Sequence, residues 1–206
     1  MCNSVVNLIF DLDGTLIDSR LRLFRLFQQL VPSSKLTYES YWNLKQDKVS
    51  NEAILCKEFG FNAAAIERFL VDWMESIEAP EFLAFDTNFP GMHETLEKLS
   101  KQARLHVCTA RQHRQPAVDQ LSRLGLLVFF QSVMVTEQSK SKEDLIASVS
   151  GLSPEDWIIG DTGKDIKVGQ ALGIKTCAVL SGFLSEKSLK PYGPDLILPI
   201  ATDFSL

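Results

Sequence analysis

The sequence has few of the side chains that usually bind zinc: its 206 residues include only three histidines and four cysteines. It contains no CxxC pair, and no cysteine and histidine together have the spacing of a zinc site, so a zinc-binding module is not expected. We interpret the cysteines as reduced, mostly buried thiols and the histidines as surface or structural residues. The residues concerned are Cys2, Cys56, Cys108 and Cys177, with His93, His106 and His113.

A surplus of positive charge is also lacking, because 21 basic residues stand against 26 acidic ones and the net charge is -5. Such a charge gives no general attraction for nucleic acid or for an anionic membrane. The apolar run from Val5 to Phe10 is interrupted by Asp11, whereas a membrane span needs about 20 apolar residues. We therefore expect a cytoplasmic globular protein, a monomer or homodimer, with no nucleic-acid and no membrane partner.

Short apolar segments alternate with helical patterns over most of the chain. The first segment, Val5 to Phe10, is nearly all apolar, as expected for a strand that is covered on both faces. Strands alternating with helices predict an α/β fold with a doubly wound, Rossmann-like parallel sheet. We expect strands at 5–10, 104–108, 133–135, 157–160 and 175–180, and helices at 92–102, 115–124, 142–149 and 165–172.

Residues 17–87 interrupt this alternation, because they contain helical patterns only. Asp18 and Ser19 are possible N-caps of a first helix, and further helices are expected at 37–44, 50–59 and 62–78. Phe89-Pro90-Gly91 then marks the return to alternation. We predict two domains: an α/β core of residues 1–16 and 88–206, and an inserted helical domain of residues 17–87.

Polar side chains follow several of the expected strands. Asp11 and Asp13 lie two residues apart at the end of the first strand, where two carboxylates repel unless a divalent cation or a shared proton compensates. Thr109 and Asp161 also follow strands, and ligands of open parallel sheets bind outside these carboxyl ends. Together with Lys142, they supply what phosphoryl transfer needs, although Asp-x-Asp-Gly alone is as often a simple turn.

Three segments resemble the motifs of the haloacid dehalogenase-like hydrolase superfamily, and they occur in the family's order. They are Asp-Leu-Asp-Gly-Thr-Leu-Ile-Asp-Ser at 11–19, Val-Cys-Thr-Ala-Arg at 107–111 and Gly-Asp-Thr-Gly-Lys-Asp-Ile at 160–166. Phe89-Pro90-Gly91-Met92 and the early insert are similar to the phosphoglycolate phosphatase-like branch, whose insert is a small helical cap. The resemblance implies a magnesium-dependent phosphatase that hydrolyses a small-metabolite phosphate monoester through an aspartyl-phosphate.

The resemblance also implies roles for individual residues. Asp11 is the implied nucleophile, and Asp13 is the implied acid and base, an acid that dehalogenases of the family lack. Magnesium is implied to lie between Asp11, the backbone carbonyl of Asp13 and Asp161, with Asp165 in or beside its shell. The implied substrate-binding residues are Thr109, Ala110, Lys142 and Arg20.

Some assignments stay open at this point. The family often has Lys-Pro before the helix that precedes the Gly-Asp strand, whereas this chain has Lys140 and Lys142, of which we favour Lys142. Arg20, Lys45 and Lys48 are candidates to meet an anionic substrate from the insert, but each also suits a solvated helix face. A phosphomutase of the same family and a catalytically idle binding or regulatory protein are the alternative functions.

Overall fold

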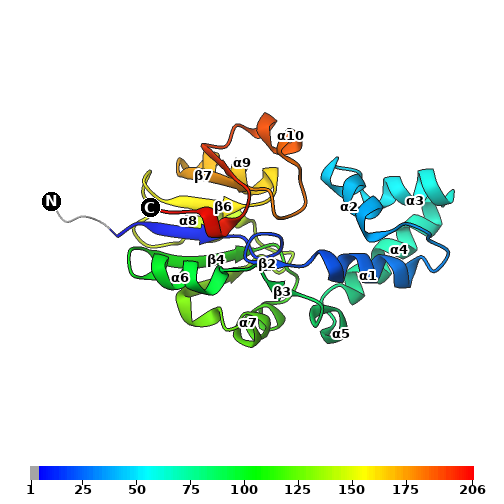
Figure 1. Cartoon of the computed structure of the whole chain (residues 1–206), viewed down its shortest axis with the longest axis horizontal. Helices are drawn as coiled ribbons and strands as arrows, with labels where there is room; N and C mark the ends of the chain where they lie inside the picture. The colour runs from blue at the N-terminus through cyan, green and yellow to red at the C-terminus, as the bar shows by residue number, and fades with distance from the viewer. Residues whose placement is uncertain (1–4) are drawn as a thin grey trace.

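The computed structural model describes residues 5–206, which contain a six-stranded sheet with all strand pairs parallel. The strand order is β5-β4-β1-β6-β7-β8 (Figure 1). Strands β4 and β5 extend the sheet on one side of β1 and strands β6, β7 and β8 extend it on the other, so the direction in which strands are added reverses between β1 and β6. This confirms the predicted doubly wound, Rossmann-like α/β fold. The strands are β1 (Asn7–Phe10), β4 (Arg104–Thr109), β5 (Phe130–Val135), β6 (Trp157–Gly160), β7 (Lys175–Val179) and β8 (Leu196–Leu198).

Helices cover both faces of the sheet, which explains why β1 is apolar at nearly every position. Leu8 and Phe10 pack with α6 (Met92–Ser100) and α7 (Arg114–Arg123) on one face. Ile9 points to the other face, where α8 (Lys142–Ala147) and α9 (Gly163–Leu172) pack. The side chains of one strand therefore divide between two hydrophobic clusters.

Residues 20–83, between β1 and β4, form a separate group of helices with a hydrophobic cluster of its own (Figure 1). The centre of this cluster is aromatic: the rings of Phe27 and Tyr41 lie 4.9 Å apart, and Phe27 also contacts Phe69. The helices are α1 (Arg20–Leu30), α2 (Tyr38–Gln46), α3 (Asn51–Phe59), α4 (Ala63–Ser76) and the short α5 (Pro80–Leu83). We call residues 20–83 the helical insert.

Side-chain caps start three of these helices at the places that the sequence pattern indicates. Thr37, Ser50 and Asn62 each accept a hydrogen bond from the backbone N–H three residues later, which satisfies a donor that the helix itself leaves free. Ser19 is the N-cap of α1, but its side chain makes no capping hydrogen bond. The predicted insert helices are thus present, with boundaries shifted by one or two residues.

A two-stranded antiparallel ribbon joins the helical insert to the sheet. It consists of β2 (Ile17–Asp18) and β3 (Thr87–Asn88), and Ile17 pairs with Asn88. Both passages of the chain between sheet and insert run through this ribbon, at the residues where the sequence pattern changes. The sequence analysis did not predict the ribbon, because two residues per strand are too few to show periodicity.

Other differences from the sequence prediction concern short elements and one thiol. The strand β8 and the one-turn helices α5 and α10 (Glu186–Leu189) were missed, since each has only three or four residues. Cys108 and Cys177 are buried free thiols as expected, whereas Cys56 is exposed and Cys2 lies outside the described residues. Among residues 5–206, no helix combines the length and the apolar character that a bilayer crossing requires.

One buried carboxylate fixes the sheet at the edge opposite to the strand ends discussed below. Asp156 accepts hydrogen bonds from the backbone and side-chain N–H groups of Asn7, at 2.7 and 2.9 Å, and from Ser153 N at 2.8 Å. We expect Asp156→Ala to lower the free energy of unfolding by about 2–4 kcal/mol, because buried donors lose their acceptor. Urea denaturation measures the change. The exposed neighbour Glu155 is the control, and equal midpoints for Asp156→Ala and Glu155→Ala would contradict the expectation.

Candidate active site

The carboxyl ends of three neighbouring strands bring the predicted site residues together. Asp11 follows β1, Thr109 ends β4 and Asp161 follows β6, and β1 and β6 flank the point where the sheet order reverses. A cavity of about 790 Å³ lies at this edge. Of the predicted residues, Asp11, Asp13, Thr109, Ala110 and Lys142 line it.

Three buried carboxylates form a cluster beside the cavity. Asp11, Asp161 and Asp165 each place one oxygen within 4.8 Å of the others. Burial raises the pKa of Asp11 to about 6, although Lys142 opposes the shift. Burial, together with the charges of Asp11 and Asp165, raises the pKa of Asp161 well above its ordinary value. Without further positive charge, this cluster is electrostatically unfavourable in its ionised form.

Lys142 compensates part of this negative charge. Its ammonium nitrogen lies 2.8 Å from Asp11 Oδ1 and 2.6 Å from Asp165 Oδ1. Burial disfavours the ammonium charge, but the two carboxylates outweigh it and raise the pKa of Lys142. Lys142 begins α8 directly after the N-cap Ser141, whereas Lys140 is exposed. The structure thus places Lys142 rather than Lys140 at the cluster.

The first turn of α9 fixes the orientation of Asp165. Its Oδ2 accepts a hydrogen bond from the backbone N–H of Thr162 at 3.3 Å, which is one half of a capping box, and another from the Thr162 hydroxyl at 2.7 Å. Its other oxygen faces Lys142. The residue therefore has a local structural reason to be acidic, in addition to its place beside Asp11 and Asp161.

Asp161 has one bound and one free oxygen. Its Oδ2 accepts a hydrogen bond from Phe183 N at 2.7 Å, while its Oδ1 is fully buried and has no hydrogen-bond partner among the described residues. A buried, unpartnered carboxylate oxygen next to two other carboxylates is what an oxygen-binding cation such as Mg²⁺ requires. Asp11, Asp161 and Asp165 therefore fit a divalent cation.

Two glycines make room for the Asp161 carboxylate. A β-carbon at Gly182 or at Gly14 would collide with Asp161 Oδ2, and Gly14 also has a φ of +80° that side chains rarely adopt. Both loops can approach the acid only because they lack side chains there. Gly14 belongs to the Asp-x-Asp-Gly segment, whereas nothing in the sequence pattern identified Gly182.

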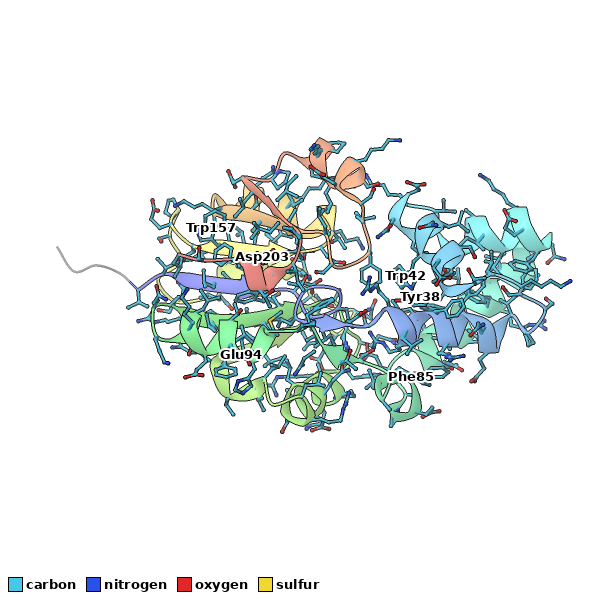
Figure 2. All side chains as sticks on the ribbon, viewed as in Figure 1. Tyr38, Trp42, Phe85, Glu94, Trp157 and Asp203 are labelled. Atoms are coloured by element: carbon cyan, nitrogen blue, oxygen red, sulfur yellow. The ribbon has the colours of Figure 1, made fainter. Side chains whose placement is uncertain are left out.

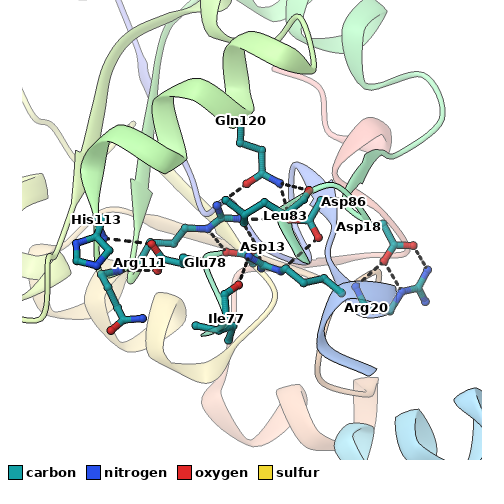
Figure 3. Close-up of polar contacts among 12 residues, drawn as sticks. Asp13, Asp18, Arg20, Ile77, Glu78, Leu83, Asp86, Arg111, His113 and Gln120 are labelled. Carbon is teal, nitrogen blue, oxygen red and sulfur yellow. Dashed lines mark hydrogen bonds and ion pairs between the residues drawn. The ribbon is translucent and has the colours of Figure 1, made fainter. Parts of the chain in front are cut away.

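Asp13 is held by two arginines from different parts of the chain, of which Figure 3 labels Arg111. Arg111, which follows β4, donates from Nε to Asp13 Oδ2 at 2.9 Å and from Nη2 to Oδ1 at 2.8 Å. Arg22 of α1 donates to the same Oδ1. Burial alone would raise the pKa of Asp13, but Arg111 and Arg22 outweigh it and hold this pKa below its ordinary value. Asp13 is thus an ionised carboxylate in this arrangement.

A second buried acid supports the two arginines. Asp86, just before the ribbon strand β3, lies 3.3 Å from Arg22 Nε and 3.5 Å from Arg111 Nη2. Gln120 of α7 donates to Asp86 and accepts from Arg111 (Figure 3). Burial raises the pKa of Asp86 to about 6. Asp86 belongs to no motif, and the sequence analysis did not identify it.

The structure corrects the expectation for Arg20. Arg20 is not among the residues that line the cavity, and its guanidinium instead pairs with Asp18 at 2.6 Å. Lys45 donates to Asn51 within the insert. Of the three insert cations predicted to meet substrate, only Lys48 lines the cavity.

The helical insert contacts the core on two sides of the cavity. The carboxylate of Glu78 accepts hydrogen bonds from Gln112 N at 2.7 Å and from His113 N at 3.2 Å. On the other side, the carbonyl oxygen of Gln46 accepts from Ser185 N at 3.3 Å. Trp42 faces the core from α2 (Figure 2), and its ring lies 5.6 Å from that of Phe183. The insert therefore forms part of the cavity wall beside the strand ends.

Comparison with known proteins assigns the family. The sequence profile of the haloacid dehalogenase-like hydrolases matches residues 8–179, a range that contains the whole carboxylate cluster. The chain belongs to this family. The membership predicted from the three motifs is therefore confirmed, and with it the classification of the protein as a hydrolase.

Relatives of this hydrolase are similar over nearly its whole length. Pyrophosphatase PpaX of Oceanobacillus iheyensis is 26% identical over 203 residues, which make up 95% of this chain and 92% of the relative. A haloacid dehalogenase-like family hydrolase from Streptococcus pneumoniae superposes with a TM-score of 0.79 at 23% identity. That superposition covers 97% of this chain and 96% of the other.

Two further solved structures share the fold. A predicted phosphoglycolate phosphatase from Haemophilus somnus gives a TM-score of 0.72 at 20% identity, over 98% of this chain and 97% of the other. The hydrolase YfnB of Bacillus subtilis, solved with bound magnesium, gives a TM-score of 0.65 at 19% identity, over 98% and 97%. These structures extend the fold assignment to the helical insert as well as the sheet.

The glycine contact with Asp161 generates a prediction for this haloacid dehalogenase-like hydrolase. We expect Gly182→Ala to weaken Mg²⁺ binding at least about tenfold, because the added methyl group displaces the Asp161 carboxylate. Isothermal titration calorimetry measures the affinity. Gly151→Ala is the control for backbone strain, since Gly151 has a φ of +75° but a β-carbon there meets no atom within 4 Å. Equal Mg²⁺ affinities for the two variants would argue against a cation at Asp161.

Proposed function

We propose that this hydrolase is a magnesium-dependent phosphatase, which cleaves a small phosphorylated metabolite through an aspartyl-phosphate on Asp11. The observation that carries the proposal is the buried cluster of three carboxylates beside a cavity, two of which pair with one ammonium group. A phosphate dianion approaches a carboxylate nucleophile only if positive charge offsets their repulsion.

The charges of the cluster leave a place for the cation. Three ionised aspartates and Lys142 sum to about minus two in a buried environment, where uncompensated charge is unfavourable. A divalent cation supplies the missing charge, and Mg²⁺ suits one or two carboxylates together with phosphate oxygens. When bound there, Mg²⁺ would lower the repulsion between the nucleophile and the phosphate and stabilise the charge of the transferring group.

Asp11 is the residue best placed to be the nucleophile. It lines the cavity, and its contact with Lys142 at 2.8 Å favours the ionised form that nucleophilic attack requires. Lys142 and the Thr109 hydroxyl, which also line the cavity, would stabilise the oxygens of the phosphoryl group. Ala110 follows Thr109 and would offer its backbone N–H there.

Asp13 would exchange protons with the leaving oxygen and with the attacking water. Its ionised state suits acceptance of a proton from water. To donate a proton, the carboxyl group must first take one up, and it therefore has to separate from Arg22 and Arg111, which favour the charged form. Arg22 belongs to the insert, so movement of the insert would change the charge that Asp13 experiences.

The helical insert would act as a cap that excludes water and selects the leaving group. Its contacts on both sides of the cavity and its attachment through one ribbon support this role. We keep the division at residues 16/17 and 87/88 as the proposed domain boundary. The cytoplasmic location and the monomeric or homodimeric state stay predictions.

The nucleophile assignment can be tested by one substitution. We expect Asp11→Asn to reduce release of inorganic phosphate from p-nitrophenyl phosphate by at least about a thousandfold, since an amide cannot form the aspartyl-phosphate. Quenched reactions of the wild type should carry phosphate on Asp11, and measuring free phosphate distinguishes a phosphatase from a phosphomutase. Asp18→Asn is the control. Unchanged turnover in Asp11→Asn would refute the proposal.

The raised pKa values predict how magnesium and pH act together on stability. A folded-state pKa of about 6 for Asp11, above the ordinary 3.8, means that the metal-free folded protein binds protons more tightly than the unfolded chain. Stability from this group is therefore greatest below 3.8 and is lost as the pH rises through about 6. Mg²⁺ offsets the charge that appears over this range.

We therefore expect the rise in melting temperature on adding Mg²⁺ to grow by several degrees between about pH 5 and about pH 7.5. Differential scanning fluorimetry with and without Mg²⁺ at each pH measures this difference. Ionisable groups remote from the cluster change both melting temperatures equally, so their contributions cancel in the difference. Asp161→Asn should flatten the pH dependence. A magnesium effect that is constant over this range in the wild type would contradict the charge argument.

A further inference from the structure

The cavity contains more positive charge than the phosphoryl site uses. Six cationic side chains line it, and three of them pair with aspartates of the site: Arg22, Arg111 and Lys142. Within residues 5–206, the other three form no ion pair with a carboxylate. They are Lys48 of the insert and Lys164 and Lys167 of α9.

Two of these lysines, both exposed, lie near the same aromatic ring. Lys48 Nζ lies 4.6 Å and Lys167 Nζ 5.5 Å from the centre of the Tyr192 ring, which itself lines the cavity. The ring attracts each ammonium group, but two ammonium groups brought to one ring also repel each other. An anion bound beside both lysines would offset this repulsion. The arrangement therefore has the charge of an anion-binding site and spans both the insert and the core.

The backbone of Lys48 gives a second, independent indication. Lys48 follows α2 with a φ of 64°, in the left-handed region that favours glycine at the end of a helix. The turn is fixed by hydrogen bonds from Lys48 N to Lys45 O and from Val49 N to Leu44 O, both 2.9 Å. A lysine here has a conformational cost that glycine would avoid, and its side chain reaches the cavity wall.

We propose that Lys48, Lys164, Lys167 and Tyr192 form a second anion subsite, which binds a negatively charged group on the leaving part of the substrate. This inference rests on the proposed phosphatase function and adds a substrate class to it. The substrate is a small phosphate compound with a second anionic group, either a carboxylate or another phosphate. One end binds at Lys142 and Thr109, and the other end binds at the lysine subsite in the same cavity.

The subsite also gives a reason for closure of the insert. Lys48 comes from the insert, whereas Lys164, Lys167 and Tyr192 belong to the core, so an anion bound among them joins the two parts. An uncharged leaving group makes no such connection. Charge on the leaving group should consequently improve binding more than its size does.

Three substrates of similar size test the subsite. 2-Phosphoglycolate has a carboxylate on its leaving group, inorganic pyrophosphate has a second phosphate, and 2-hydroxyethyl phosphate has a neutral hydroxyl. The measured quantity is the ratio of kcat/KM for each anionic compound to kcat/KM for 2-hydroxyethyl phosphate. In the wild type we expect at least one ratio of about ten or more, with the difference mainly in KM.

Lys48→Gly and Lys167→Met should each lower that ratio about tenfold. Lys48→Gly removes the charge at a position whose backbone suits glycine, so misfolding is not expected. Lys48→Arg should retain the ratio. Lys57→Met, which removes an exposed lysine of α3 that does not line the cavity, is the matched control and should also retain it.

The outcomes separate the subsite from the proposed function. A fall of the phosphoglycolate ratio identifies a carboxylate ligand, and a fall of the pyrophosphate ratio identifies a phosphate ligand. Wild-type ratios near one, or equal ratios in the wild type and both lysine variants, overturn the subsite while the phosphatase stands. If the wild type hydrolyses none of the three compounds or p-nitrophenyl phosphate, the proposed function fails. In that case calorimetric binding affinities replace kcat/KM, and the same ratios of each anionic compound to 2-hydroxyethyl phosphate are compared between the wild type and the lysine variants.

Discussion

Repulsion among the buried carboxylates at the ends of β1 and β6 is the constraint on which the site depends. Parallel strands that leave the sheet side by side deliver Asp11 and Asp161 to one place, and the first turn of α9 adds Asp165. Lys142 can bridge Asp11 and Asp165 because α8 begins at this edge. The strand order, the start of α8 and the absence of a side chain at Gly182 together allow the three aspartates to lie close to one another.

The helical insert is connected to this cluster through a second set of charges. Arg22 reaches from α1 to Asp13, and Asp86 beside the ribbon supports both Arg22 and Arg111. Because these groups are buried, their ion pairs are weakly screened and depend strongly on geometry. The position of the insert and the charge state around Asp13 are consequently linked by ion pairs beside the ribbon that joins the insert to the sheet.

Much of the fold and the centre of the site follow from local patterns in the sequence. The apolar run before Asp11 and the helix starts at Thr37, Ser50 and Asn62 are local signals, and short-range geometry decides them. Asp86, Gly182 and the pairing of Arg22 with Asp13 depend on segments that meet only in three dimensions. Arg20 shows the same limit, since nothing local indicated that Asp18 would hold its guanidinium.

Main-chain groups make part of the contact between the insert and the core. The carbonyl of Gln46 accepts from Ser185, and Glu78 accepts from the backbone N–H groups of Gln112 and His113. The main-chain contacts of Gln46 and His113 do not depend on the side chains at these two positions, whereas the Gln112 side chain also donates to Met74 O at 2.7 Å. Mutations at Gln46 and His113 can therefore accumulate during evolution without shifting the docked position of the insert, so the sequence at this contact can diverge while the buried carboxylates keep their places.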